Sequence, residues 1–155
     1  MRPFLLFIYS LFFVALANCT SKKVEPIDFN HDSCHYCKML ITDKRFGAEI
    51  VASKGKNYKF DSLECMQNFE GEQPDKVGAE GKRYVVDTSS QEGVLILVDE
   101  AFYFVDPKIR SPMGLGFMTS SSEEGLKKLV GADKSNQFIR WNEVKSKLPS
   151  VKGKP

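Results

Sequence analysis

The pattern of apolar and polar residues in the first half of the chain predicts a hairpin, a helix and a further strand. Residues 48–52 alternate as a strand does, and the alternation resumes at 58–60 after a turn that contains a glycine, which is typical of a β-hairpin. Ser62 then stands at the position of a helix N-cap, and apolar residues follow at roughly helical spacing over 62–70. Residues 83–87 return to a strand pattern.

The pattern of the second half of the chain predicts a repeat of this order. Residues 95–98 and 102–105 predict two strands. A run of serines followed by acidic residues suits the start of a helix over 121–130. Residues 137–141 predict a last strand. We therefore expect the α+β fold class, with two ββαβ units packed on a shared core as one compact domain.

A short apolar run at the N-terminus predicts an export signal. Arg2 precedes the 14 apolar-rich residues Phe4–Ala17, whereas a membrane-spanning helix needs about 20 residues. Cys19 directly follows this run, and residues 16–19 resemble the lipobox of bacterial lipoproteins, in which the cysteine is acylated and becomes the first residue. Asn18 departs from the usual Gly, Ala or Ser, so an ordinary secretory signal cleaved nearby is the alternative.

The predicted domain organisation is one folded domain behind a leader and a tether. We expect a lipoprotein signal peptide at 1–18, a flexible tether at 19–28, the folded domain at 29–148 and a disordered tail at 149–155. The two ββαβ units are expected at about 29–90 and 91–148.

Charge and isolated acids exclude several classes of function. The net charge of +2 gives no strong field that would attract nucleic acid or anionic substrates. Asp61 and Asp99 read as isolated acids, and the sequence offers no nucleophile–base pair. We therefore expect a protein that is not an enzyme, that takes no small-molecule substrate and that binds no nucleic acid.

The number of cysteines points to chemistry rather than to disulfide bonds alone. The chain contains four cysteines. If Cys19 carries lipid, Cys34, Cys37 and Cys65 remain, and an odd number of thiols cannot all pair within the chain. Small exported domains normally use their cysteines in disulfides. At least one thiol is therefore expected to be free, metal-bound or paired with another molecule.

Residues 34–39 bring two thiols, an imidazole and a thioether into six positions. Thiolate and thioether sulfur are the soft ligands that select Cu(I). The C-x-x-C spacing also fits a zinc site, to which Cys65 with His31 or His35 would add ligands, or a redox dithiol. The residues after Cys37 suit a strand or loop better than the helix that a redox dithiol needs. We favour Cu(I) and keep zinc and redox chemistry as alternatives.

A second sulfur-bearing segment lies in the loop 111–116. Methionine in a core usually occupies a helix or strand face, whereas Met113 stands between Pro and Gly, so we predict that it joins the metal site. Cys65 and Met66 lie on the predicted helix. We expect Met66 to be a core residue, and Cys65 to be a small buried residue, with a reserve metal ligand as the alternative. The predicted Cu(I) ligands are the thiolate of Cys37, the thioethers of Met39 and Met113, and Cys34 or His35 as a spare ligand.

Six short motifs in this order resemble the NosL family of copper-binding lipoproteins, which are encoded with nitrous oxide reductase. The motifs are Cys19; Cys34, Cys37 and Met39; Phe60–Asp61; Tyr84–Asp87; Ala101–Phe104; and Pro112–Gly114. Lys38 stands where the family often has Gly, and Gly131–Ala132 stands where Gly-Gly is common. Neither departure removes a sulfur ligand.

The resemblance implies a Cu(I) metallochaperone, anchored by lipid on a bacterial membrane and facing the periplasm or the cell exterior. It also implies a duplicated ββαβ fold, delivery of copper for maturation of the copper site of nitrous oxide reductase, and an ABC-type maturation complex as a partner. Two other functions stay open from the residues themselves. One is a periplasmic thiol–disulfide oxidoreductase that uses Cys34 and Cys37, and the other is a zinc-binding interaction module.

Overall fold

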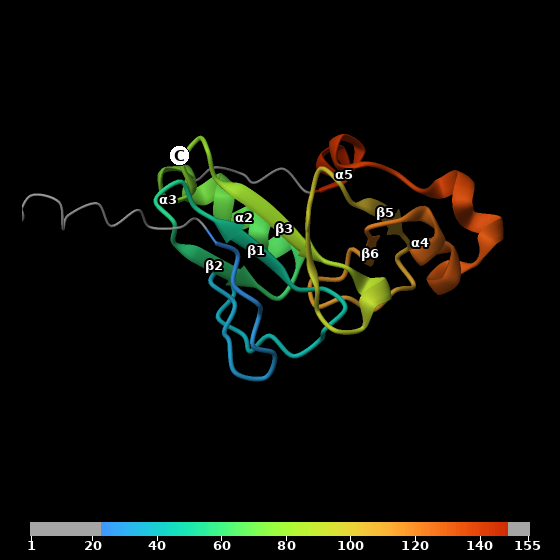
Figure 1. Ribbon diagram of the computed structural model, residues 1–155, viewed down its shortest axis with the longest axis horizontal. Helices are drawn as coiled ribbons and strands as arrows, with labels where there is room; N and C mark the ends of the chain where they lie inside the picture. The colour runs from blue at the N-terminus through green and yellow to red at the C-terminus, as the bar shows by residue number, and fades with distance from the viewer. Residues whose placement is uncertain (1–22, 149–155) are drawn as a thin grey trace, which may run out of the picture.

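The structure is a computed structural model that describes residues 23–148 (Figure 1). The predicted signal peptide at 1–18, the predicted acylation of Cys19 and the predicted tail at 149–155 lie outside the described residues. Within the described range, none of the helices has the length and apolar character that crossing a membrane requires.

A four-stranded antiparallel sheet is the framework of the first half. Its strands are β1 (Ala48–Val51), β2 (Asn57–Phe60), β3 (Lys82–Val86) and β4 (Leu95–Leu97), and their order across the sheet is β2-β1-β3-β4. Ala48 on the central strand β1 faces Phe60 of β2 on one side and Val85 of β3 on the other. All residues of β1 are buried, because both faces of the sheet are covered at this strand.

The helix α2 (Leu63–Glu72) covers one face of this sheet and contacts β1 and β2. The Ser62 hydroxyl caps the helix by accepting a hydrogen bond from the backbone N–H of Cys65 over 3.2 Å. The ring of Phe69 packs on that of Phe60, with 5.2 Å between ring centroids. Because β2 ends at Phe60 and the cap is Ser62, Asp61 lies alone between strand and helix. The predicted helix start is confirmed.

The second half also runs strand, strand, helix. Its elements are β5 (Phe102–Val105), β6 (Phe117–Ser120) and α4 (Glu123–Val130). β5 and β6 pair as a separate antiparallel sheet, which lies beside the first half in Figure 1. One hydrophobic core contains residues of both halves, so the α+β class and the shared core are confirmed. The remaining short elements are α3 (Pro74–Val77), the 3₁₀ helices η2 (Thr88–Ser90) and η3 (Ala132–Gln137), and α5 (Trp141–Lys147).

Two strands differ from the pattern that the sequence predicts. The strand expected at 95–98 within the second unit is β4, which pairs with β3 of the first sheet. The strand expected at 137–141 is an isolated bridge between Ile139 and Tyr103, and Trp141 begins α5. The physical reason is that buried residues at Trp141, Val144 and Leu148 follow helical spacing, which extends beyond the short alternating stretch.

The chain segment 23–28, which belongs to the predicted tether, packs against the face of the first sheet opposite α2. Ile27 is buried, and the backbone N–H of Glu25 donates a hydrogen bond to Oε1 of Glu49 on β1 over 3.1 Å. The side-chain amide of Asn57 donates to the carbonyl oxygen of Lys23 over 3.1 Å. The packed part of the chain therefore begins before Phe29, which is the residue at which the sequence predicts the folded domain to begin.

Candidate metal site

A tight turn at 34–39 presents the C-x-x-C motif. The backbone N–H of Cys34 donates to the carbonyl oxygen of Met39 over 2.8 Å, and that of Lys38 donates to the carbonyl oxygen of Cys34 over 3.0 Å. Lys38 has φ of 68°, the left-handed conformation that glycine adopts with the least strain. A glycine at this position would therefore be less strained than Lys38.

His35 attaches this turn to the edge strand β2. Its backbone N–H donates to the carbonyl oxygen of Lys59 over 2.8 Å, and its Nδ1 accepts from the backbone N–H of Lys59 over 3.0 Å. Burial lowers the pKa of His35, in keeping with a neutral ring that accepts at Nδ1. His35 is not among the residues whose ligand atoms cluster. Its contacts therefore favour a positioning role over that of a spare ligand.

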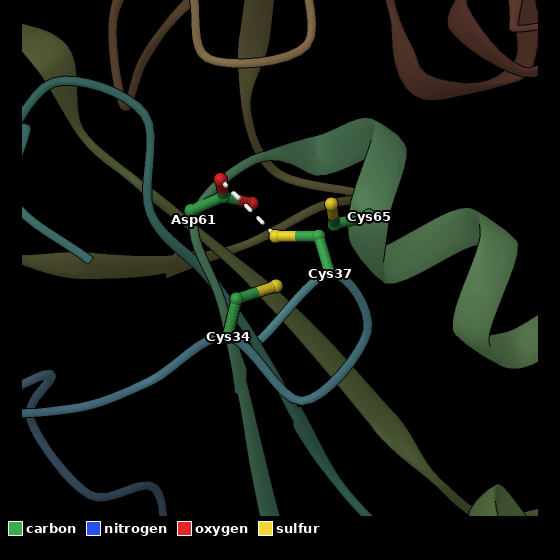
Figure 2. A group of neighbouring side chains, drawn as sticks. All are labelled: Cys34, Cys37, Asp61 and Cys65. Carbon is green, nitrogen blue, oxygen red and sulfur yellow. Dashed lines mark hydrogen bonds between the residues drawn. The ribbon is translucent and has the colours of Figure 1, made fainter. Parts of the chain in front are cut away.

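Four side chains bring their ligand atoms together where this turn meets the start of α2 (Figure 2). The sulfur atoms of Cys34, Cys37 and Cys65 and a carboxylate oxygen of Asp61 all lie within 4.8 Å of one another. Cys34 and Cys65 are fully buried, and Asp61 is 4% exposed. Cys37 is half-buried. We call this set the thiol–carboxylate cluster.

Two members of the thiol–carboxylate cluster are absent from the ligands that the sequence predicts. Cys65 reads as a small core residue because it lies in the first turn of an apolar helix. Asp61 reads as an isolated acid because its distance from Cys34 in the sequence hides their proximity. The pairing of β2 with β1 and the Ser62 cap bring both residues to the C-x-x-C turn. The odd number of thiols was the available signal for Cys65.

The three thiols of the cluster differ in pKa because their burial and their neighbouring groups differ. A hydrogen bond from Cys65 lowers the pKa of Cys34 to about 6, and the same contact, with burial, raises the pKa of Cys65. Burial raises the pKa of Cys37, and the adjacent Cys34 thiol and Asp61 carboxylate raise it further. Cys34 is therefore the thiol that most readily carries charge, and Cys65 the one that donates to it.

Asp61 leaves one buried oxygen without a partner. The Cys37 thiol donates to Oδ2 of Asp61 over 3.6 Å. Oδ1 is buried and has no hydrogen-bond partner among residues 23–148. A buried carboxylate oxygen without a partner is costly, and one that lies among three thiols matches a ligand position better than a structural one.

Met39 lies in an open groove beside the cluster. The groove has a volume of about 400 Å³, and its lining includes Met39, Asp61, Ser111 and Pro112. The Met39 side chain is 51% exposed. Asp61 thus belongs both to the groove and to the thiol–carboxylate cluster, so the groove adjoins the cluster.

The loop that carries Met113 is attached next to Cys65. The backbone N–H of Leu115 donates to Oε1 of Glu64 over 3.2 Å, and Glu64 directly precedes Cys65 in α2. The Met113 side chain is 41% exposed, and the two residues before it line the groove that also contains Met39. Met39 and Met113 therefore belong to two segments that meet around one groove, and both side chains face solvent.

The donor set of the cluster fits a soft or borderline metal ion. Three thiols suit Cu(I), which binds two or three soft ligands. The same thiols with the Asp61 carboxylate also make the four ligands that a zinc site requires. The thiols start from a turn and from the third residue of a capped helix rather than from a C-x-x-C helix N-terminus, so the geometry differs from that of a redox dithiol of that type.

A family sequence model, a known protein sequence and a solved structure each match this chain. Residues 26–149 match the sequence model of the NosL family. The chain is similar to the copper-binding lipoprotein NosL of Stutzerimonas stutzeri, with 28% identity over 145 residues, which cover 86% of this chain and 75% of that protein. Its fold is similar to the crystal structure of the copper chaperone NosL from Shewanella denitrificans, with a TM-score of 0.59 and 23% identity over 79% of this chain and 95% of that chain.

Proposed function

The chain belongs to the NosL family, and we propose that this protein is a Cu(I) carrier that holds the ion on sulfur and passes it to a recipient protein. The observation that carries the proposal is the thiol–carboxylate cluster, in which three thiols and Asp61 place ligand atoms within 4.8 Å of one another. A carrier needs a binding site with an open side and no catalytic machinery. We therefore propose a metallochaperone rather than an enzyme.

Cys37 is the proposed link between the buried thiols and the surface. It is half-buried, whereas Cys34 and Cys65 are fully buried. We assign Cys37 as the thiolate that holds Cu(I), with Met39 and Met113 as thioether ligands on the groove side. Cys34, which is fully buried, is the spare ligand. A thiolate neutralises the charge of the ion, and neutral thioethers bind Cu(I) without losing a proton.

Exposed thioethers favour transfer by ligand exchange. The side chains of Met39 and Met113 are 51% and 41% exposed, so a sulfur ligand of another protein can approach the ion from the same side. The incoming ligand binds before the thioethers release the ion, and copper is never free in solution. This order of events explains why a carrier would place its weakest ligands outermost.

We propose that the recipient is nitrous oxide reductase during maturation of its copper site, or an ABC-type complex that serves this maturation. The support is family membership together with the copper chaperone fold. We also propose that Cys19 carries lipid, which would hold the carrier on the periplasmic or outer side of a bacterial membrane and raise its concentration near a membrane partner. Full lipoprotein acylation is required for this, because a single chain anchors only marginally.

Anaerobic titration of the reduced protein with Cu(I), in competition with a Cu(I) chelator, tests the proposal. Met39→Ala and Met113→Ala should each weaken Cu(I) binding about tenfold or more, the scale on which changes around a metal act. Leu40→Ala is the matched control, because Leu40 is 47% exposed next to Met39 but carries no sulfur. Unchanged affinity in both methionine variants would remove the thioethers from the site.

A zinc-binding interaction module is the second candidate, and Asp61 is the observation that favours it. Three thiolates and one carboxylate would complete a closed four-ligand site. Zinc should then remain in the purified protein, and a chelator should unfold it. Tight Cu(I) binding by a zinc-free protein that is already folded would exclude this candidate.

A further inference from the structure

The carboxylate of Asp61 is not required by a carrier of Cu(I) alone. Cu(I) selects sulfur, whereas Cu(II) takes nitrogen and oxygen ligands. Asp61 is nevertheless 4% exposed and directs its carboxylate among three thiols. Its Oδ1 has no hydrogen-bond partner within residues 23–148. An oxygen donor inside a sulfur site fits an ion that prefers oxygen ligands, as Cu(II) does.

We propose that this site also accepts Cu(II) and reduces it to Cu(I), with the thiols of Cys34 and Cys65 as the electron donors. The inference rests on the proposed function, because it takes copper as the cargo. Two Cu(II) ions each gain one electron. One S–S bond forms between the sulfur atoms of Cys34 and Cys65, and the proton of the Cys65 thiol leaves to water, together with that of Cys34 in chains where Cys34 is protonated.

The positions of the three thiols divide their roles. Cys34 and Cys65 are both 0% exposed, and their sulfur atoms lie within 4.8 Å of each other, so these two thiols form the buried pair of the cluster. The Cys37 thiol instead turns to Asp61 over 3.6 Å. Figure 2 shows the three sulfur atoms grouped beside the Asp61 carboxylate. Oxidation of the inner pair leaves Cys37 free to hold Cu(I).

The groove supplies the route for the oxidised ion. It is lined by Met39 and Asp61, so an ion that enters the groove comes to the residue that carries the oxygen ligand of the cluster. After reduction, the ion prefers sulfur, which the proposed carrier ligands Cys37 and Met39 supply. The change of oxidation state therefore moves copper from the Asp61 oxygen to the proposed carrier ligands. Each chain acts once, until a dithiol reduces the disulfide.

Electron paramagnetic resonance provides the test, because Cu(II) gives a signal and Cu(I) does not. The purified protein, reduced and metal-free, receives two equivalents of copper(II) sulfate without oxygen. We expect both equivalents to lose their signal, two thiols per chain to disappear, and peptide mass spectrometry to find a Cys34–Cys65 disulfide. A persistent Cu(II) signal with three intact thiols would overturn the proposal, and so would a Cys34–Cys37 disulfide.

Two variants test the assigned roles. Cys65→Ala should slow the reduction at least about tenfold, because it removes one of the two thiols that donate electrons. The rate depends on having both reacting groups in position. Asp61→Asn keeps all thiols and should slow it about 10- to 100-fold. Asp43→Asn is the matched control, because Asp43 lines the same groove but is held by Arg45 over 2.6 Å. Equal rates in Asp61→Asn and Asp43→Asn would remove Asp61 from the reaction.

The reduction and the carrier function can fail separately. Titration with Cu(I) under reducing conditions bypasses the reduction and reports only the carrier site. Tight Cu(I) binding without Cu(II) reduction would leave the proposed function intact and refute the reduction. Cu(II) reduction by a protein that binds Cu(I) weakly would refute the carrier function instead.

Discussion

The thiol of Cys37 donates a hydrogen bond to the carboxylate of Asp61 over 3.6 Å, although the two residues come from a turn and from the end of a strand. Cys37 is the half-buried thiol of the cluster, whereas Cys34 and Cys65 are fully buried. The hydrogen bond stabilises the protonated form of Cys37, whose pKa burial, the Cys34 thiol and the Asp61 charge raise. The carrier thiol is therefore held protonated until metal displaces its proton.

Replacing Asp61 should make Cys37 more reactive toward an alkylating reagent. Asp61→Asn removes a negative charge beside the thiol, so the pKa of Cys37 falls and more thiolate is present near neutral pH. Iodoacetamide labelling, read at Cys37 by peptide fragmentation, should become faster than in the wild type. An unchanged rate would mean that the carboxylate does not control this thiol. Asp43→Asn should leave the rate unaltered.

His35 should affect stability rather than supply a copper ligand. His35→Ala removes the ring that accepts from the backbone N–H of Lys59, and a half-buried donor left without a partner costs about 1–3 kcal/mol. Urea unfolding should detect a loss of this size, whereas His31→Ala, at an exposed side chain, should not. If His35→Ala keeps its stability but loses Cu(I) binding, His35 is a ligand, as the sequence suggests.

Lys38 should gain stability when it is replaced by glycine. Its φ of 68° strains a residue with a Cβ atom, and Lys38→Gly should raise the free energy of unfolding by about 1 kcal/mol. Lys44→Gly is the control, since Lys44 is exposed and is not among the residues with positive φ. A loss of stability in Lys38→Gly would show that the hydrogen bond from Lys38 Nζ to the carbonyl oxygen of His35 outweighs the strain.

Glu49 should make stability fall as the pH rises toward neutral. Burial raises the pKa of Glu49 to about 7 from an ordinary 4.5, so between these values the unfolded chain releases a proton that the folded chain keeps. Relative to Glu49→Gln, the wild type should lose about 3 kcal/mol of unfolding free energy from pH 4.5 to pH 7. Urea unfolding at both pH values measures this difference. A constant difference would mean that Glu49 does not stay protonated under the segment 23–28.

Local sequence predicts the helices and strands near the site, but it does not predict which elements they pair with or pack against. Alternation and the Ser62 cap correctly predict the hairpin and the start of α2, because each signal acts within a few residues. The alternation at 137–141 predicts a strand wrongly, because the burial of Trp141 on Tyr103, with 5.9 Å between ring centroids, depends on residues far apart in the sequence. The partner of β4 has the same long-range origin.

The residues of the candidate site are likewise predicted only where they are close in the sequence. The C-x-x-C spacing marks Cys34 and Cys37, since their proximity is set by one turn. Cys65 and Asp61 join them only through the pairing of β2 with β1 and the packing of α2 on that sheet. A single thiol on an apolar helix and a single acid after a strand carry no signal of that contact. The predicted roles of Met39 and Met113 remain predictions.

X-ray absorption at the copper edge tests the central claim most directly. The reduced protein loaded with one equivalent of Cu(I) should show a first shell of sulfur atoms around copper, with no nitrogen or oxygen ligand. Cys37→Ser should remove one sulfur from that shell, and Met39→Ala should remove another. A first shell of nitrogen and oxygen, or a sulfur shell that neither variant alters, would contradict the account.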